Sequence, residues 1–121
     1  MLQKGIVVRF IFCVLFVSSF IVHSQDMLTN LRNNDIISFA QQQYGSQGHA
    51  RIKSWLSFID EAINKNEWKK IHLVNDFFNE KIKYKSDQAL WQKADYWATP
   101  LESLGTGMGD CEDYVIAKYF T

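Results

Sequence analysis

The sequence predicts an α+β fold that is mostly helical. Three stretches carry apolar residues at helical spacing, one short stretch alternates apolar with charged residues, and a glycine-rich approach leads into a last apolar helix. The 121 residues are enough for one small domain. Hydrophobic residues make up 47% and aromatic residues 15%, which is typical of a packed globular protein. The formal net charge is zero, so no basic excess indicates binding to nucleic acid.

Residues 1–24 have the pattern of a secretory signal peptide. Lys4 and Arg9 give a positively charged start, residues 10–22 are almost wholly apolar, and Ser24 is a small residue at the expected cleavage point. This apolar run is shorter than the roughly 20 residues that a membrane-spanning helix needs. We therefore expect an exported protein without a transmembrane span in the mature chain, in which residues 25–34 form a flexible linker. An uncleaved N-terminal anchor is the alternative.

Removal of the signal peptide would leave a single cysteine. Cys13 lies within the segment that is lost, whereas Cys111 remains. Lys4 and Arg9 are lost as well, so that the acids of the mature chain outnumber its bases. One cysteine cannot form an internal disulfide. In an exported protein it is therefore a buried inert thiol, an intermolecular link or a reactive group.

Three helices are expected in the first two thirds of the domain. Asp35 suits the N-cap of the first, and residues 45–48, rich in glycine, are expected to end it. Residues 50–63 form the clearest amphipathic helix, and residues 67–80 form the third, with Asn66 as its cap. In the first helix, apolar residues at helical spacing are Ile36, Ile37, Phe39, Ala40 and Tyr44. In the second, they fall on one stripe: Ile52, Trp55, Leu56, Ile59, Ala62 and Ile63. In the third, the residues expected to face inward are Trp68, Ile71, Val74, Phe77 and Phe78. Facing stripes of this kind predict an antiparallel helical pair.

Residues 81–98 follow a different pattern. Apolar residues alternate with lysines over residues 81–86, which predicts a short extended segment whose lysines discourage pairing with another sheet. Residues 87–98 are expected to be irregular or weakly helical. Thr99, Pro100 and Glu102 then have the spacing of a capping box with proline at the first helical position, and this short helix is expected to end at Gly105.

The most informative stretch is residues 105–120, where three alternate glycines lead to one cysteine among acids. Asp110 is expected as the N-cap of a helix, with Cys111, Glu112 and Asp113 as its first three residues. Since the rest of this helix is apolar on most sides, we expect it to be central in the fold. A thiol on the first turn points at unpaired backbone N–H groups, and the helix dipole there favours the thiolate.

The same residues permit a purely structural interpretation. A lone cysteine near a helix start is often a small buried hydrophobic residue, and the acids are ordinary helix caps. Three carboxylates close to a thiol also disfavour the thiolate. A bound divalent cation would remove this conflict, and carboxylate oxygens in an exported protein suit Ca²⁺.

Residues 97–119, W-A-T-P-L-E-S-L-G-T-G-M-G-D-C-E-D-Y-V-I-A-K-Y, closely resemble the bacterial transglutaminase-like cysteine proteinases. Within that family they are most similar to the LapG-type proteases, which are periplasmic and calcium-dependent. Residues 50–55, 74–84 and 86–91 resemble the same family. The resemblance implies a papain- or transglutaminase-like fold. Of that fold, residues 35–121 would hold mainly the helical N-terminal lobe and the nucleophile helix, without the sheet half.

The resemblance also implies a function. Cys111 would be the catalytic nucleophile, and Asp110 and Glu112 would be the Ca²⁺ ligands. The implied activity is hydrolysis of the N-terminal region of a large surface adhesin in the periplasm, which would control biofilm attachment. The implied regulator is an inner-membrane receptor for cyclic-di-GMP.

One departure from the family pattern bears on activity. In the family the catalytic histidine and acid follow the cysteine, and no histidine follows Cys111 in this sequence. We expect neither His49 nor His72 to act as the general base. The sequence therefore predicts an N-terminal fragment of such a protease, inactive on its own. The alternatives are a non-catalytic exported helical binding module, or an amidase or transglutaminase that uses the same cysteine.

Overall fold

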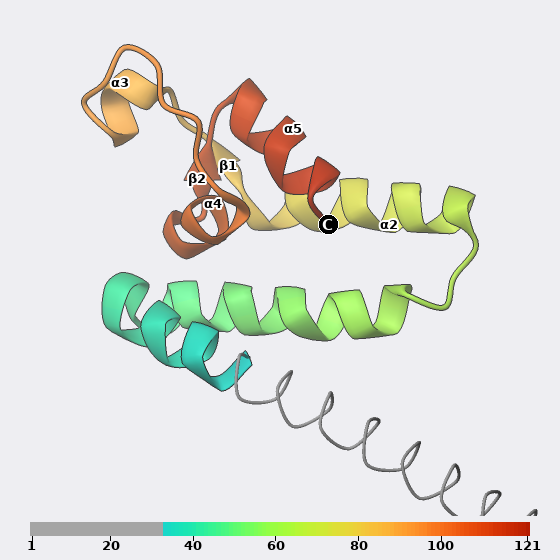
Figure 1. Ribbon diagram of the computed structural model, residues 1–121. Helices are drawn as coiled ribbons and strands as arrows, with labels where there is room; N and C mark the ends of the chain where they lie inside the picture. The colour runs from blue at the N-terminus through green and yellow to red at the C-terminus, as the bar shows by residue number, and fades with distance from the viewer. Residues whose placement is uncertain (1–32) are drawn as a thin grey trace, which may run out of the picture. The chain divides into compact units, whose positions relative to one another are not determined.

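The computed structural model describes residues 33–121, of which residues 36–121 form one compact unit. The expected signal peptide lies outside the described residues, as does nearly all of the expected linker. A helical segment over residues 33–62 comes first (Figure 1). It is followed by α2 (Glu67–Lys81), β1 (Lys83–Tyr84), α3 (Asp87–Leu90), α4 (Pro100–Thr106), β2 (Met108–Gly109) and α5 (Cys111–Tyr119). Over the described residues, every helix is too short or too polar to cross a membrane.

The first helical segment changes direction where the sequence predicts a break. Residues 45–48 remain helical, but Gly45 has a φ of 67°, which only glycine adopts readily. Gly48 is buried, and a Cβ atom there would lie 2.7 Å from the carbonyl oxygen of Gly105. This glycine therefore allows the helical segment to approach α4 closely.

The antiparallel helical pair is present. After a turn at residues 63–66, α2 runs back along residues 46–62 (Figure 1). The side chain of Asn66 caps α2 as predicted, accepting a hydrogen bond from the N–H of Lys69 at 2.9 Å. Between the two helices the rings of Phe58 and Phe77 stack with their centroids 4.6 Å apart.

The predicted inward face of α2 is only partly correct. Phe78 is fully buried, but Trp68 is 73% exposed and Ile71 is 59% exposed. The reason is that α4, α5 and the strands gather over the C-terminal half of α2 and leave its first turns uncovered within the described residues (Figure 1). The buried core consists of Ala40, Ile52, Phe78, Ile82, Leu104 and Ala117.

The extended segment predicted at residues 81–86 forms a two-residue strand, and it pairs with a second strand that the sequence did not indicate. β1 and β2 are parallel, with Lys83 opposite Met108 and Tyr84 opposite Gly109. The N–H of Lys83 donates to the carbonyl of Gly107, and that of Lys85 to the carbonyl of Gly109, each at 2.9 Å. The glycine-rich approach to Cys111 is thus held in a strand over its last two residues.

The helix that carries the cysteine is less central than predicted. Within the described residues α5 packs against α2 and α4 on one side only, so Asp113 and Ala117 are its buried residues. Val115, Tyr119 and Phe120 are large, apolar and exposed. The apolar composition of α5 therefore produces an uncovered apolar face in residues 33–121, in place of a buried helix.

Candidate active site

Cys111 is the first residue of α5, and its thiol is exposed. Asp110 is the N-cap, as predicted, and it forms a reciprocal capping box with Asp113. The N–H of Asp110 donates to Oδ2 of Asp113 at 3.2 Å, and the N–H of Asp113 donates to Oδ1 of Asp110 at 3.5 Å. The first turn of the helix, including the cysteine, is thereby fixed by side chains on both sides of the thiol.

The chain before Cys111 is shaped by two glycines. Gly107 ends α4 in the left-handed conformation, with a φ of 69°. A Cβ atom on Gly109 would lie 2.8 Å from Cβ of Asp113, so only glycine leaves room for that carboxylate. Together they allow the chain to leave α4, pair with β1 and start α5 within a few residues.

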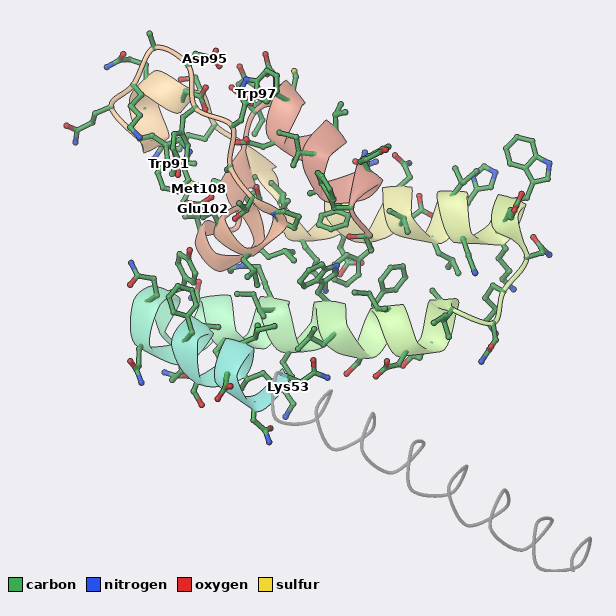
Figure 2. The ribbon with its side chains drawn as sticks, in the orientation of Figure 1. Lys53, Trp91, Asp95, Trp97, Glu102 and Met108 are labelled. Carbon is green, nitrogen blue, oxygen red and sulfur yellow. The ribbon has the colours of Figure 1, made fainter. Side chains whose placement is uncertain are left out.

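An apolar hollow lies beside the thiol. It has a volume of about 280 Å³ and is lined by Trp97, Cys111, Glu112, Val115 and Ile116. Trp97 is 68% exposed and lies next to the start of α5 (Figure 2). A second hollow shares Trp97 and Ile116 with the first and extends toward Pro100 and Phe120. The thiol therefore stands at the edge of an open apolar surface.

Three carboxylates converge near the start of α5. Asp87, Asp110 and Asp113 each offer an oxygen, and these atoms lie within 4.8 Å of one another. Asp87 begins α3 just after β1, and Asp110 follows β2 directly. Because β1 and β2 are parallel, their carboxyl ends lie at the same edge of the sheet, and this brings the two aspartates together.

Asp113 is the buried member of this cluster, with no exposed surface. Its Oδ1 accepts a hydrogen bond from the N–H of Ala98 at 2.8 Å. Burial is the largest influence on the pKa of Asp113 and raises it. The hydrogen bonds from Ala98 and Asp110 act against this rise, whereas the charges of Asp110 and Asp87 add to it. The cluster therefore favours a bound positive charge or a proton.

The cluster also contains an acceptor without a protein donor. Asp87 is 6% exposed, and its Oδ2 accepts from the N–H of Tyr96 at 2.7 Å. Its Oδ1 is buried and has no hydrogen-bond partner among the described residues. A free carboxylate oxygen close to two other carboxylates is the donor set that a hard cation such as Ca²⁺ prefers, so the residues fit such an ion.

Of the two cation ligands predicted from the resemblance, Asp110 and Glu112, one lies in this cluster. Asp110 belongs to it, but Glu112 is exposed on the first turn of α5 and is not part of it. The sequence did not single out Asp87, and it assigned Asp113 only a capping role. Asp87 lies directly after the predicted extended segment. This position indicates a ligand only when the parallel pairing of β1 with β2 is known, because that pairing brings Asp87 next to Asp110.

The two histidines of the described residues lie on helices other than α5, which carries Cys111. His72 is exposed on α2 and stacks on Trp68, with ring centroids 6.0 Å apart. His49 is half-buried in the first helical segment. That neither histidine acts as a general base stays a prediction.

Comparison with known proteins supports the resemblance to the bacterial transglutaminase-like cysteine proteinases. Residues 53–120 match the family described as bacterial transglutaminase-like cysteine proteinase, BTLCP. The match includes α2 and every later element, with Cys111 and all three clustered aspartates. A search of curated proteins gave no match. The chain belongs to the bacterial transglutaminase-like cysteine proteinase family.

Proposed function

We propose that this protein is a cysteine endopeptidase in which Cys111 is the nucleophile. The observation that carries the proposal is the placement of an exposed thiol on the first turn of α5, at the edge of an apolar hollow, in a chain of a cysteine peptidase family. In such a reaction the sulfur attacks the scissile carbonyl and expels the amine, which leaves with a proton. Water then hydrolyses the acyl-enzyme and regenerates the thiol.

The first turn of α5 can serve this chemistry. The N–H groups of the first four residues of an α-helix have no partner within the helix. Asp110 accepts the N–H groups of Asp113 and Tyr114, through its side chain and its carbonyl respectively. The N–H groups of Cys111 and Glu112 then remain to stabilise the oxyanion of a tetrahedral intermediate.

Calcium dependence is part of the proposal. Ca²⁺ bound by the aspartate cluster would neutralise the negative charge beside the thiol and hold the loop that carries Trp97 against α5. Asp110 is common to the ligand pair expected from the family and to the cluster in the structure. Asp87 and Asp113 would complete the set, with Glu112 as a further ligand from the first turn.

The proposed substrate and regulation follow the LapG-type resemblance. The substrate is the N-terminal region of a large surface adhesin, cut in the periplasm after export of the protease. The regulator is an inner-membrane receptor that binds cyclic-di-GMP and sequesters the protease. The apolar hollow beside the thiol supports a peptide substrate with a small or apolar side chain near the cleaved bond.

The test is cleavage by the complete gene product, because the 121 residues are expected to be inactive on their own. An adhesin N-terminal fragment is incubated with the wild type, Cys111→Ala and the exposed control Lys53→Met, in Ca²⁺ and in EGTA, and the products are weighed by mass spectrometry. We expect cleavage by the wild type and the control in Ca²⁺, and none by Cys111→Ala. Cleavage that EGTA and Cys111→Ala both leave unchanged would defeat the proposal.

A second candidate is a non-catalytic binding module. It is favoured by the exposed apolar face of α5. Fast labelling of Cys111 by iodoacetamide at neutral pH counts against this candidate. A folded protein whose thiol stays unlabelled supports the binding module.

Transfer of an amine to a glutamine side chain would instead identify a transglutaminase.

A further inference from the structure

Arg51 lies in the first helical segment and reaches across to the end of α4. Its Nε donates to the carbonyl oxygen of Leu104, and its terminal nitrogen donates to that of Gly105, each at 2.6 Å. Carbonyls in the last turn of an α-helix have no acceptor role within the helix and carry its partial negative charge. The planar guanidinium satisfies two of them at once, which a single ammonium group cannot do.

The contact continues into the turn that follows α4. Gly107 adopts the left-handed conformation, and a Cβ atom on it would lie 2.8 Å from the guanidinium carbon of Arg51. Arg51 thus covers the backbone of this turn as well as capping the helix. Since only a glycine leaves space for the guanidinium, the two residues depend on each other.

From this turn the chain runs directly to the thiol. The carbonyl of Gly107 accepts from the N–H of Lys83, and that of Gly109 from the N–H of Lys85, each at 2.9 Å. Asp110 then caps α5, and Cys111 follows. The backbone that carries the thiol is therefore held at two points, by β1 on one side and by Arg51 at its start.

Arg51 has no competing electrostatic role in residues 33–121. No carboxylate there lies within ion-pair distance of its guanidinium. It also precedes the residues matched by the family, which begin at residue 53. Its guanidinium donates to the two carbonyls at the end of α4. The elements that follow α4 in the chain are β2 and then α5, which begins with Cys111.

We propose that Arg51 is a positioning residue for Cys111: it fixes the end of α4, and with it the turn and strand that deliver the thiol to the start of α5. The inference rests on the proposed role of Cys111 as a nucleophile. Without Arg51, the turn at Gly107 loosens and the first turn of α5 frays. The thiol then loses the favourable interaction with the helix N-terminus that makes it reactive.

The test compares Arg51→Met, Arg51→Lys and Lys53→Met with the wild-type full chain. Met retains an apolar stem without a donor, Lys retains the charge and can bond one carbonyl, and Lys53 is an exposed control on the same helix (Figure 2). The readouts are the rate of Cys111 alkylation by iodoacetamide at fixed neutral pH, circular dichroism, and the amide resonances of Gly107, Met108 and Gly109. A helix N-terminus contributes about 0.3–1 kcal/mol, so we expect folded Arg51→Met to react about two- to fivefold more slowly.

Arg51→Lys should recover part of the rate, and Lys53→Met should react like the wild type. The three amide resonances should shift in Arg51→Met and not in the control. If folded Arg51→Met reacts at the wild-type rate with unshifted amides, Arg51 does not position the thiol, although the proposed nucleophile stands. If Arg51→Met does not fold, a wild-type rate in Arg51→Lys overturns the inference. An unreactive wild-type thiol would remove the proposed function and this inference together.

Discussion

Asp113 accepts a hydrogen bond from the backbone N–H of Ala98, fifteen positions earlier in the chain, at 2.8 Å. The bond joins the first turn of α5 to the loop that carries Trp97, and both of its residues are fully buried. One side of the apolar hollow is therefore attached to the helix that carries the thiol.

The first prediction concerns this bond. Asp113→Ala removes the acceptor for Ala98 and half of the capping box, leaving a buried donor unsatisfied, and we expect a loss of about 1–3 kcal/mol in the free energy of unfolding. Urea denaturation followed by circular dichroism measures it. Asp95→Ala, an exposed change in the same loop (Figure 2), should alter stability by less than about 0.5 kcal/mol. Equal stabilities of the two variants would show that the bond between Asp113 and Ala98 contributes little.

The second prediction separates steric crowding from backbone strain at two glycines. Gly109→Ala places a Cβ atom 2.8 Å from Cβ of Asp113, whereas Gly45→Ala meets no atom within 4 Å but has a φ of 67°. Overpacking should cost about 1–3 kcal/mol at Gly109, and left-handed strain about 1–2 kcal/mol at Gly45. Thermal unfolding measures both. Only Gly109→Ala should also change the alkylation rate of Cys111. A change in that rate for Gly45→Ala would argue against a local effect.

The third prediction concerns pH. Burial alone would raise the pKa of Glu102, but hydrogen bonds from Thr99 and Tyr96, with the charge of Lys93, outweigh it and lower the pKa. The ionised form is therefore favoured in the fold. Its contribution to stability is present above the pKa of an unfolded Glu, about 4.3, and is lost as pH falls through the lower pKa of the folded state.

Glu102→Gln should accordingly be less stable than the wild type by about 1 kcal/mol at neutral pH. The difference should shrink as pH falls below about 4. Urea denaturation of both proteins at several pH values gives the difference directly. A difference that stays constant with pH would mean that the carboxylate charge of Glu102 does not contribute to stability.

The fourth prediction concerns the aspartate cluster. Ca²⁺ that binds only the folded protein stabilises it by about 2.7 kcal/mol at a concentration 100 times Kd. We expect Ca²⁺ to raise the Tm of the wild type relative to EGTA, and Asp87→Asn to reduce this rise because it removes the charge of the buried Asp87. Asp95→Asn is the matched control. A Tm that is the same in Ca²⁺ and EGTA would contradict cation binding by the cluster.

The local signals in the sequence predicted much of the site. The caps at Asn66, Thr99 and Asp110 are set by the residues within one helical turn of each, and all three are present. The place of Cys111 at the start of α5 follows from the same short-range rule. Such features depend on side-chain to backbone bonds over three residues, which a sequence displays directly.

The long-range features were not predictable in this way. The parallel pairing of β1 with β2 depends on backbone hydrogen bonds between segments about 25 residues apart, and no side-chain pattern at Met108 and Gly109 indicates a strand. The convergence of Asp87 on Asp110 follows from that pairing and was missed with it. The exposure of Trp68 likewise depends on which elements cover α2, and the helical spacing of its apolar residues does not contain that information.

The pairing of Lys83 with Met108 has a consequence for the order of folding. Closing a flexible loop of about 25 residues costs roughly 3 kcal/mol of chain entropy. This cost arises before the two short strands form any hydrogen bonds with each other. The antiparallel helical pair involves closer neighbours in the chain and can form first. We therefore expect the thiol to reach its final surroundings late in folding. In the partly folded chain, Cys111 would not yet lie at the start of an ordered helix and would not be activated.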